Sequence, residues 1–245
     1  MSVHKLWGDD NTLLIYKRLH FSKNCPYILK RLSFTLGNGL SIIYWHGFIY
    51  NKSRNVAYRI VPKAACTSLN SSVLNVNSDD VLDVHTASWM YKVSSDQLES
   101  NTFVFTYVRN PYKRILSCYL NMKYGSHGIN DTISNGITAY LTKSSTFRNF
   151  LLRFIFMPKF LLDFHLMPQS YILKYDLNRI NFLDKLENIS NTFPNIKNRF
   201  GLNSLPHYNE SNLPNDAPEV QYTKFLKLLV YIKYRKDFKM FGYKR

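Results

Sequence analysis

Two segments of this chain each have the pattern of an apolar strand that ends at a cation and turns directly into a helix. The first runs from Tyr58 to Leu69 and the second from Phe103 to Ser117. Turns of this kind place a helix N-terminus and a positive charge together, which is the geometry that binds phosphate groups. Two such turns in one chain predict a site for two anionic groups.

The first turn follows a run rich in β-branched and aromatic residues that Pro62 ends. Lys63 is therefore expected at the carboxyl edge of the strand. The small side chains of Ala64 and Ala65 let a ligand approach the backbone closely. The segment predicts a phosphate-binding turn built without glycine.

Thr67 and Ser68 are the expected caps of the helix that follows, and their hydroxyl groups can also face an oxyanion. Lys63 precedes Thr67 by four positions, whereas a Walker A loop has its Lys directly before Ser or Thr. This spacing disfavours a kinase. Taken alone, the turn is equally consistent with a solvated lysine at a sheet edge.

The second turn favours phosphate binding over a merely solvated lysine. Phe103–Val108 is apolar enough for a central strand, and Arg109 follows it directly. Asn110 is a good N-cap residue and Pro111 a good first helical residue. The planar guanidinium of Arg109 suits a phosphate because it donates two hydrogen bonds at once.

Beyond Pro111, the apolar residues recur at helical spacing, at Ile115, Leu116, Tyr119 and Leu120. This spacing leaves Arg114 and Ser117 on other parts of the helix surface. We expect Arg109 and Ser117 to bind one phosphate together.

The chain has 245 residues and 45% hydrophobic residues, which suits one domain spanning 1–245, with a lead-in of uncertain structure at 1–55. Strands alternate with helices along the chain. This alternation predicts an α/β fold with a central parallel sheet and helices on both faces.

Three further elements are expected. Ile172–Tyr175 has the pattern of a strand, and Asp176 caps a helix marked by Leu177, Ile180, Leu183 and Leu186. A C-terminal helix is marked by Tyr222, Phe225, Leu229 and Ile232. Another helix carries an aromatic stripe that is typical of a core, made by Phe147, Phe150, Leu151, Phe154 and Ile155.

The formal net charge of +16 predicts an anionic partner. The basic residues are scattered, and no nucleic-acid-binding signature is present, so nucleic acid is a secondary candidate. Arg148, Arg153 and Lys159 beside the aromatic stripe leave peripheral membrane association open.

Three cysteines, Cys25, Cys66 and Cys118, show neither disulfide nor metal-site spacing, which indicates reduced thiols. The N-terminus lacks the profile of a signal peptide, and no apolar stretch reaches membrane-spanning length. A cytoplasmic location is expected.

The segments 61–68 and 108–117 resemble the two cofactor signatures of the carbohydrate sulfotransferases, a family of Golgi-type enzymes and bacterial relatives that use 3′-phosphoadenosine 5′-phosphosulfate (PAPS). The resemblance continues at 163–169, at 174–177 and at 234–243, and so covers the chain from about Val56 to its end. It implies a nucleotide-kinase-like, P-loop-type sulfotransferase fold. The chain departs from the pattern at Ala64 and Ala65, where relatives often have a glycine, and at Asn110, where they often have an acid.

By position, the resemblance implies that Lys63 contacts the phosphosulfate and its bridging oxygen. It implies backbone and hydroxyl donors from Ala64, Ala65, Cys66, Thr67 and Ser68. Arg109 and Ser117 would hold the 3′-phosphate. No metal is implied.

Sulfuryl transfer also needs a base, because the acceptor hydroxyl loses its proton as it attacks. His165 lies in the segment 163–169, and His85 lies between the two cofactor turns. Each histidine is a candidate base, and a core or surface imidazole is the alternative for each.

The sequence therefore predicts a PAPS-dependent sulfotransferase that acts on a hydroxyl of a carbohydrate or glycoconjugate. By analogy with phosphoryl transfer, such an enzyme mainly positions its substrates and neutralises charge. The alternatives are a nucleotide-dependent kinase on a similar scaffold and a non-enzymatic basic protein that binds polyanions.

Overall fold

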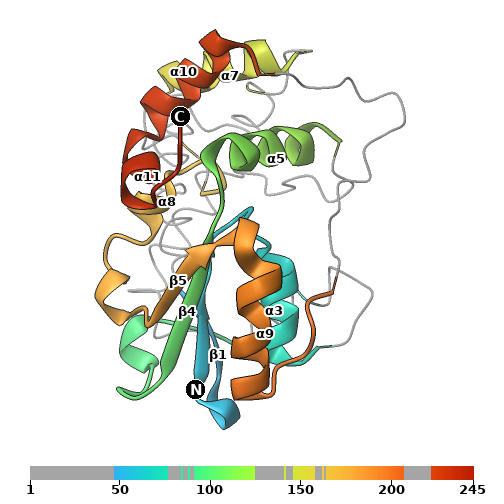
Figure 1. Cartoon of the computed structure of the whole chain (residues 1–245), viewed down its shortest axis with the longest axis vertical. Helices are drawn as coiled ribbons and strands as arrows, with labels where there is room; N and C mark the ends of the chain where they lie inside the picture. The colour runs from blue at the N-terminus through green and yellow to red at the C-terminus, as the bar shows by residue number, and fades with distance from the viewer. Residues whose placement is uncertain are drawn as a thin grey trace, which may run out of the picture.

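The computed structural model describes residues 47–76, 84, 88, 91–124, 141, 146–157, 162, 164–206 and 222–245. These residues contain a five-stranded sheet (Figure 1). In spatial order its strands are β3 (Lys92–Val93), β1 (Phe48–Asn51), β2 (Val56–Arg59), β4 (Phe103–Val108) and β5 (Phe182–Lys185).

Strands β2, β4 and β5 run parallel, while β1 is antiparallel to both β2 and β3. The α/β class is confirmed. The sheet is mixed rather than wholly parallel because only a short 3-10 turn, Lys52–Arg54, joins β1 to β2, and so short a connection permits only antiparallel pairing. Strand β1 lies inside the lead-in 1–55, where the sequence indicates a strand or hairpin only between Ser41 and Tyr50.

Two helices pack on one face of the sheet, α3 (Cys66–Leu74) and α9 (Ile189–Phe200) (Figure 1). Alternate strand residues point to that face, and Tyr58 and Phe105 share a cluster there with Leu69 of α3 and Phe193 of α9. Their neighbours along the strands point to the other face. On that other face, Phe48, Tyr50, Ala57 and Val104 of the strands cluster with Leu98, and Val93 of β3 and Ile180 pack against them.

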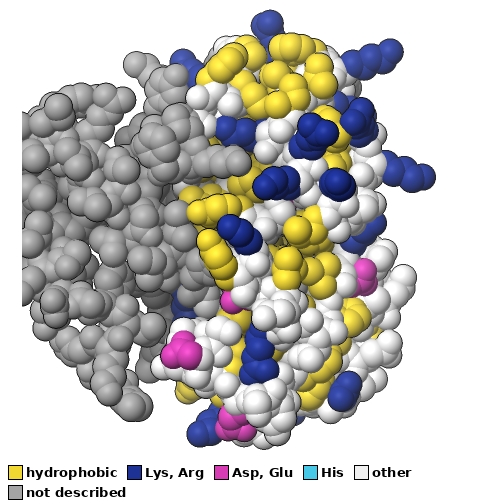
Figure 2. All heavy atoms as spheres, turned by 90° about the vertical axis from the view of Figure 1, so that its left-hand side faces the viewer, with side chains coloured by type: hydrophobic (Ala, Val, Ile, Leu, Met, Phe, Trp, Pro, Cys, Tyr) yellow, Lys and Arg dark blue, Asp and Glu magenta, His cyan; other side chains and the backbone are white. Residues whose placement is uncertain are grey.

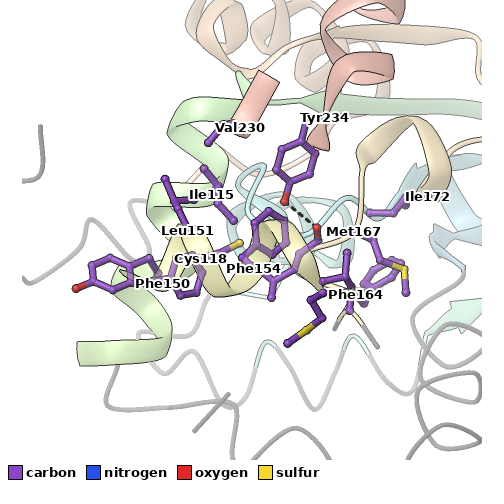
Figure 3. Packing of buried hydrophobic residues seen from close by; sticks show 14 of the residues in the cluster. Ile115, Cys118, Phe150, Leu151, Phe154, Phe164, Met167, Ile172, Val230 and Tyr234 are labelled. Carbon is purple, nitrogen blue, oxygen red and sulfur yellow. Dashed lines mark hydrogen bonds between the residues drawn. The ribbon is translucent and has the colours of Figure 1, made fainter. Parts of the chain in front are cut away.

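The remaining described helices build a second core beyond the carboxyl ends of the parallel strands. They are α5 (Pro111–Tyr124), α7 (Phe147–Phe156), α8 (Gln169–Ile172), α10 (Lys224–Lys233) and α11 (Arg235–Met240). Figure 3 shows Phe150, Phe154 and Tyr234 in this core, with the Tyr234 hydroxyl donating to the Leu166 carbonyl oxygen at 2.7 Å. Most of the predicted stripe on α7 is core, since Phe147, Phe150, Leu151 and Phe154 are buried, while Ile155 is half-buried.

The strand predicted at Ile172–Tyr175 is wrong, and so is the helix predicted from Leu177 to Leu186. Residues 169–176 form α8 and a turn, and the third parallel strand is Phe182–Lys185. The buried Arg59 guanidinium explains the turn, because it binds the Asp176 carboxylate at 2.6 Å and the Ile172 carbonyl oxygen at 2.8 Å. Pairing with β4 then fixes the strand, so tertiary contacts override the local helical spacing.

The C-terminal helix is confirmed, but it does not bury the face that its spacing suggested. Leu226 and Val230 of α10 are buried, whereas Phe225 and Ile232 are exposed. No described helix is both long and apolar enough to cross a membrane.

Candidate functional site

The first predicted turn occupies the connection between β2 and α3. Lys63 has a φ of 65° and Ala65 a φ of 58°, in the left-handed region that side chains other than glycine rarely adopt. Such strained residues cluster at functional sites. Ala64, between them, is fully buried.

Helix α3 begins one residue earlier than its expected cap. Ala65 occupies the N-cap position, so the prediction that Thr67 or Ser68 caps the helix is wrong. Because alanine has no polar side chain, the cap contributes no hydrogen bond to the first turn. A helix N-terminus with this type of cap leaves backbone N–H groups for an anion.

The second predicted turn lies beside the first. The Nη1 atom of Arg109 donates a hydrogen bond to the Lys63 carbonyl oxygen at 3.1 Å. Asn110 accepts from the Tyr112 N–H at 2.9 Å and Pro111 is the first helical residue, as predicted. The structure therefore brings together the two cations that the sequence singled out.

Gln169 fixes the backbone of Arg109, a role that the sequence did not reveal. Its side-chain oxygen accepts from the Arg109 N–H and its Nε2 atom donates to the Arg109 carbonyl oxygen, both at 2.8 Å. Asp237, on α11, in turn accepts from the backbone N–H groups of Gln169 and Ser170 at 2.8 and 2.9 Å. The side chains of Gln169 and Asp237 are fully buried.

Arg114 is the main error in the predicted helix surface, because it is buried rather than exposed. Its Nε atom donates to the Pro62 carbonyl oxygen at 3.0 Å, and its Nη1 atom donates to the Met167 carbonyl oxygen at 2.7 Å. It thereby joins α5 to the Lys63 turn. Its Nη2 atom is buried and has no hydrogen-bond partner among the described residues.

The charges around Lys63 act on its protonation. Burial lowers the pKa of Lys63, the thiols of Cys118 and Cys66 oppose this effect, and the guanidinium groups of Arg109 and Arg114 add to it. Burial also lowers the pKa of Arg109, and Glu187 partly offsets that change. Since the nearby cations repel one another, an anion bound among them is favoured.

This donor set fits a phosphate or sulfate group. Lys63 and Arg109 supply positive charge, and α3 supplies a helix N-terminus without a side-chain cap. Arg114 supplies a buried N–H group that has no partner in the part of the chain that the structure describes. Each of these features favours a bound oxyanion.

The other predicted site residues have mixed outcomes. Ser117 is half-buried on α5, two turns beyond Arg109, and its part in phosphate binding stays a prediction. Thr67 and Ser68 are buried in the first turn of α3, and Cys66, its first residue, is half-buried.

The two candidate bases lie in different parts of the chain. His165 is half-buried in the turn that precedes α8, and its carbonyl oxygen accepts from the Cys118 thiol at 3.0 Å. Arg114 bonds both to Pro62, the neighbour of Lys63, and to Met167 in the same turn as His165, so this turn adjoins the predicted site. His85 lies outside the described residues.

The described part of the chain contains no group of three or more His, Cys, Asp or Glu residues that could hold a metal ion.

Comparison with known proteins gave one finding. The model of the sulfotransferase family matches residues 46–244, which is most of the chain and includes every site residue discussed above. Searches of curated proteins and of solved structures found no match. With the two turns side by side and the family model spanning both, the chain belongs to the sulfotransferase family, in agreement with its resemblance to the carbohydrate sulfotransferases.

Proposed function

We propose that this transferase moves a sulfuryl group from PAPS to a hydroxyl group of a carbohydrate or glycoconjugate. Membership of the sulfotransferase family supports sulfuryl transfer and an acceptor of some kind. The main observation that supports PAPS as the sulfuryl donor is the hydrogen bond between Arg109 and the Lys63 carbonyl oxygen. It joins two separate anion-binding turns, as a donor with two separated anionic ends requires.

Lys63 and the start of α3 are assigned to the phosphosulfate. Lys63 and the backbone from Ala64 to Ser68 bind its oxygens, and the ammonium group neutralises charge as the bridging oxygen leaves. PAPS supplies the activated sulfuryl group. The depressed pKa of free Lys63 is relieved when an anion binds beside it.

Arg109 and Ser117 are assigned to the 3′-phosphate. The guanidinium of Arg109 is already oriented by its bond to Lys63, and its backbone is fixed by Gln169. A fixed arginine loses little conformational entropy when it binds, which favours tight recognition.

A histidine is assigned to the acceptor side. His165 and His85 are the two candidates for removing the proton of the attacking hydroxyl. The hydrogen bonds that join the His165 turn to Cys118 and, through Arg114, to Pro62 beside Lys63 support His165. Single-turnover rates of His165→Ala and His85→Ala would distinguish them, and normal rates in both would exclude both.

We also propose a single domain in the cytoplasm. The two described cysteines, Cys66 and Cys118, are not joined in a disulfide, which supports a reducing compartment. Transfer by this proposal needs no metal.

The function can be tested with PAPS labelled in its sulfuryl group and a panel of oligosaccharide acceptors. We expect labelled product with the native protein and none with Lys63→Ala. The matched control is Lys113→Ala, which removes an exposed lysine from the neighbouring helix α5. Turnover by Lys63→Ala would show that Lys63 is not required for transfer. A native protein that neither transfers the sulfuryl group nor binds the nucleotide would refute the proposal.

A further inference from the structure

Helix α10 has apolar residues both on the side that packs against the protein core and on an exposed side. Its inner face is covered, since Leu226 and Val230 are buried against the second core. On another side Phe225, Leu228 and Ile232 follow one another at helical spacing and are 50%, 53% and 58% exposed. A surface helix normally places polar residues there.

Phe156, at the end of α7, is another exposed apolar side chain near this surface. It is 83% exposed. Lys233 of α10 donates to the carbonyl oxygens on either side of it, Ile155 at 3.1 Å and Met157 at 2.6 Å. Phe156 therefore adjoins the end of α10 that carries Ile232. We call Phe156, Phe225, Leu228 and Ile232 the apolar ridge.

Basic residues surround the apolar ridge. The exposed ones on α10, α11 and the C-terminal residues are Lys224, Lys227, Arg235, Lys236, Lys239, Lys244 and Arg245. The only acidic side chain between Thr223 and Arg245 is Asp237, which is buried and bound to backbone N–H groups. Figure 2 shows hydrophobic side chains gathered at the α7–α10 end of the molecule, with Lys and Arg around them.

We propose that the apolar ridge and its basic surround dock this protein on an anionic lipid bilayer. An interfacial helix inserts its apolar side chains at the level of the headgroups, while lysines and arginines contact lipid phosphates. Both halves of this chemistry are present on one surface. The helix that the sequence suggested for such a role, α7, buries its stripe instead.

Other anionic partners fit this surface less well. A polysaccharide or nucleic acid would match the cations but would leave four exposed apolar side chains in water. A second copy of the chain would cover the ridge but would bring two basic surfaces together, which costs free energy. A bilayer satisfies the apolar and the charged groups at once.

The test is sedimentation of the purified full chain with vesicles. We expect binding to phosphatidylcholine vesicles that contain about 30% phosphatidylserine and much weaker binding to pure phosphatidylcholine. Raising the salt from about 0.15 M to about 1 M should weaken the binding, because the screening length falls. Equal binding to both kinds of vesicle, or no binding, would overturn the proposal.

Variants locate the contact. Leu228→Ser combined with Ile232→Ser should weaken vesicle binding by about tenfold or more, since the exposed apolar surface is what inserts. Lys224→Glu combined with Lys227→Glu should remove the preference for anionic vesicles. The matched control is Tyr175→Ser, which removes a 68% exposed aromatic side chain beyond α8. Circular dichroism confirms that each variant is folded.

Two further results would overturn the proposal. The first is a native protein that does not bind vesicles but forms a dimer in analytical ultracentrifugation, when Leu228→Ser combined with Ile232→Ser abolishes that dimer. The second is unchanged vesicle binding in the serine variant. Lys63→Ala should bind vesicles normally, so this proposal and the proposed sulfuryl transfer can fail separately.

Discussion

Lys63 combines two features that are costly in a folded protein, a left-handed backbone conformation and a partly desolvated charge. Its φ is 65°, and burial is the main cause of its lowered pKa. Neither feature helps the chain to fold. Both are expected where the backbone curves around a bound anion and a cation is held in place beside the anion site.

The lowered pKa makes nucleotide binding depend on pH. A bound anion favours the charged form, so the pKa of Lys63 is higher in the complex than in the free protein, and binding takes up a proton wherever free Lys63 is neutral. The affinity for adenosine 3′,5′-bisphosphate should therefore fall as pH rises through the pKa of free Lys63, below the ordinary lysine value of 10.5. Calorimetry across this pH range measures the effect.

Lys63→Arg is the control for this pH dependence, because a guanidinium stays charged throughout the range. Its affinity should change little with pH, whatever its absolute value. A native protein whose affinity is constant up to pH 10.5 would contradict the assignment of Lys63 to the ligand.

Gln169 is predicted to position Arg109 for nucleotide binding. Gln169→Leu leaves the Arg109 N–H and carbonyl groups without their partner, which should lower the free energy of unfolding by about 1–3 kcal/mol and weaken nucleotide binding. Urea denaturation and calorimetry measure the two effects. Gln97→Leu is the control, since Gln97 bonds to the exposed Ser94 N–H, and it should cost less. Equal losses in the two variants would count against a positioning role for Gln169.

At the scale of elements, one buried ion pair ties β2 to the turn after α8. Arg59 and Asp176 are far apart in sequence, yet the Arg59 guanidinium bonds to the Asp176 carboxylate and to three backbone carbonyl oxygens. This arrangement explains why the segment after Gln169 turns rather than forming a strand. It holds the Gln169 helix against the sheet edge that carries Lys63 and Arg109.

Asp176→Ala should be strongly destabilising. It leaves the buried Arg59 charge without its counter-ion, and breaking a buried pair in this way typically costs about 3–5 kcal/mol. Asp96→Ala, at an exposed turn, is the matched control and should cost far less. Urea denaturation of the two variants compares them, and similar midpoints would show that the pair contributes little.

Elements whose local pattern agrees with their tertiary contacts were predictable from the sequence. Strand Phe103–Val108 and the Asn110–Pro111 helix start were correct, because apolar run and capping residues coincide there. Strand β5 was missed because its pairing with β4 determines it.

The charged residues of the site were predictable from the sequence, but the residues that position them were not. Lys63 and Arg109 each follow a recognisable strand, so their convergence followed from sheet geometry. Arg114, Gln169 and Asp237 act through contacts with distant backbone groups, and nothing in their local spacing indicates such partners. Gln169 and Asp237 do lie in segments that resemble the family, which was the only signal for them.

At the scale of the whole molecule, two groups of basic residues differ in their surroundings within a chain of net charge +16. Lys63, Arg109 and Arg114 lie together at the sheet edge, where they are half-buried or buried. Many others are exposed on α10, α11 and the C-terminal residues (Figure 2). The first set suits a small anionic donor, and the second suits an extended anionic surface.

Calorimetry with adenosine 3′,5′-bisphosphate tests whether Lys63 and Arg109 serve one nucleotide. The native protein should bind it, Lys63→Ala and Arg109→Ala should each weaken the affinity by about tenfold or more, and Lys113→Ala should match the native protein. Dissociation constants that stay at the native value in both Lys63→Ala and Arg109→Ala would contradict a shared donor site.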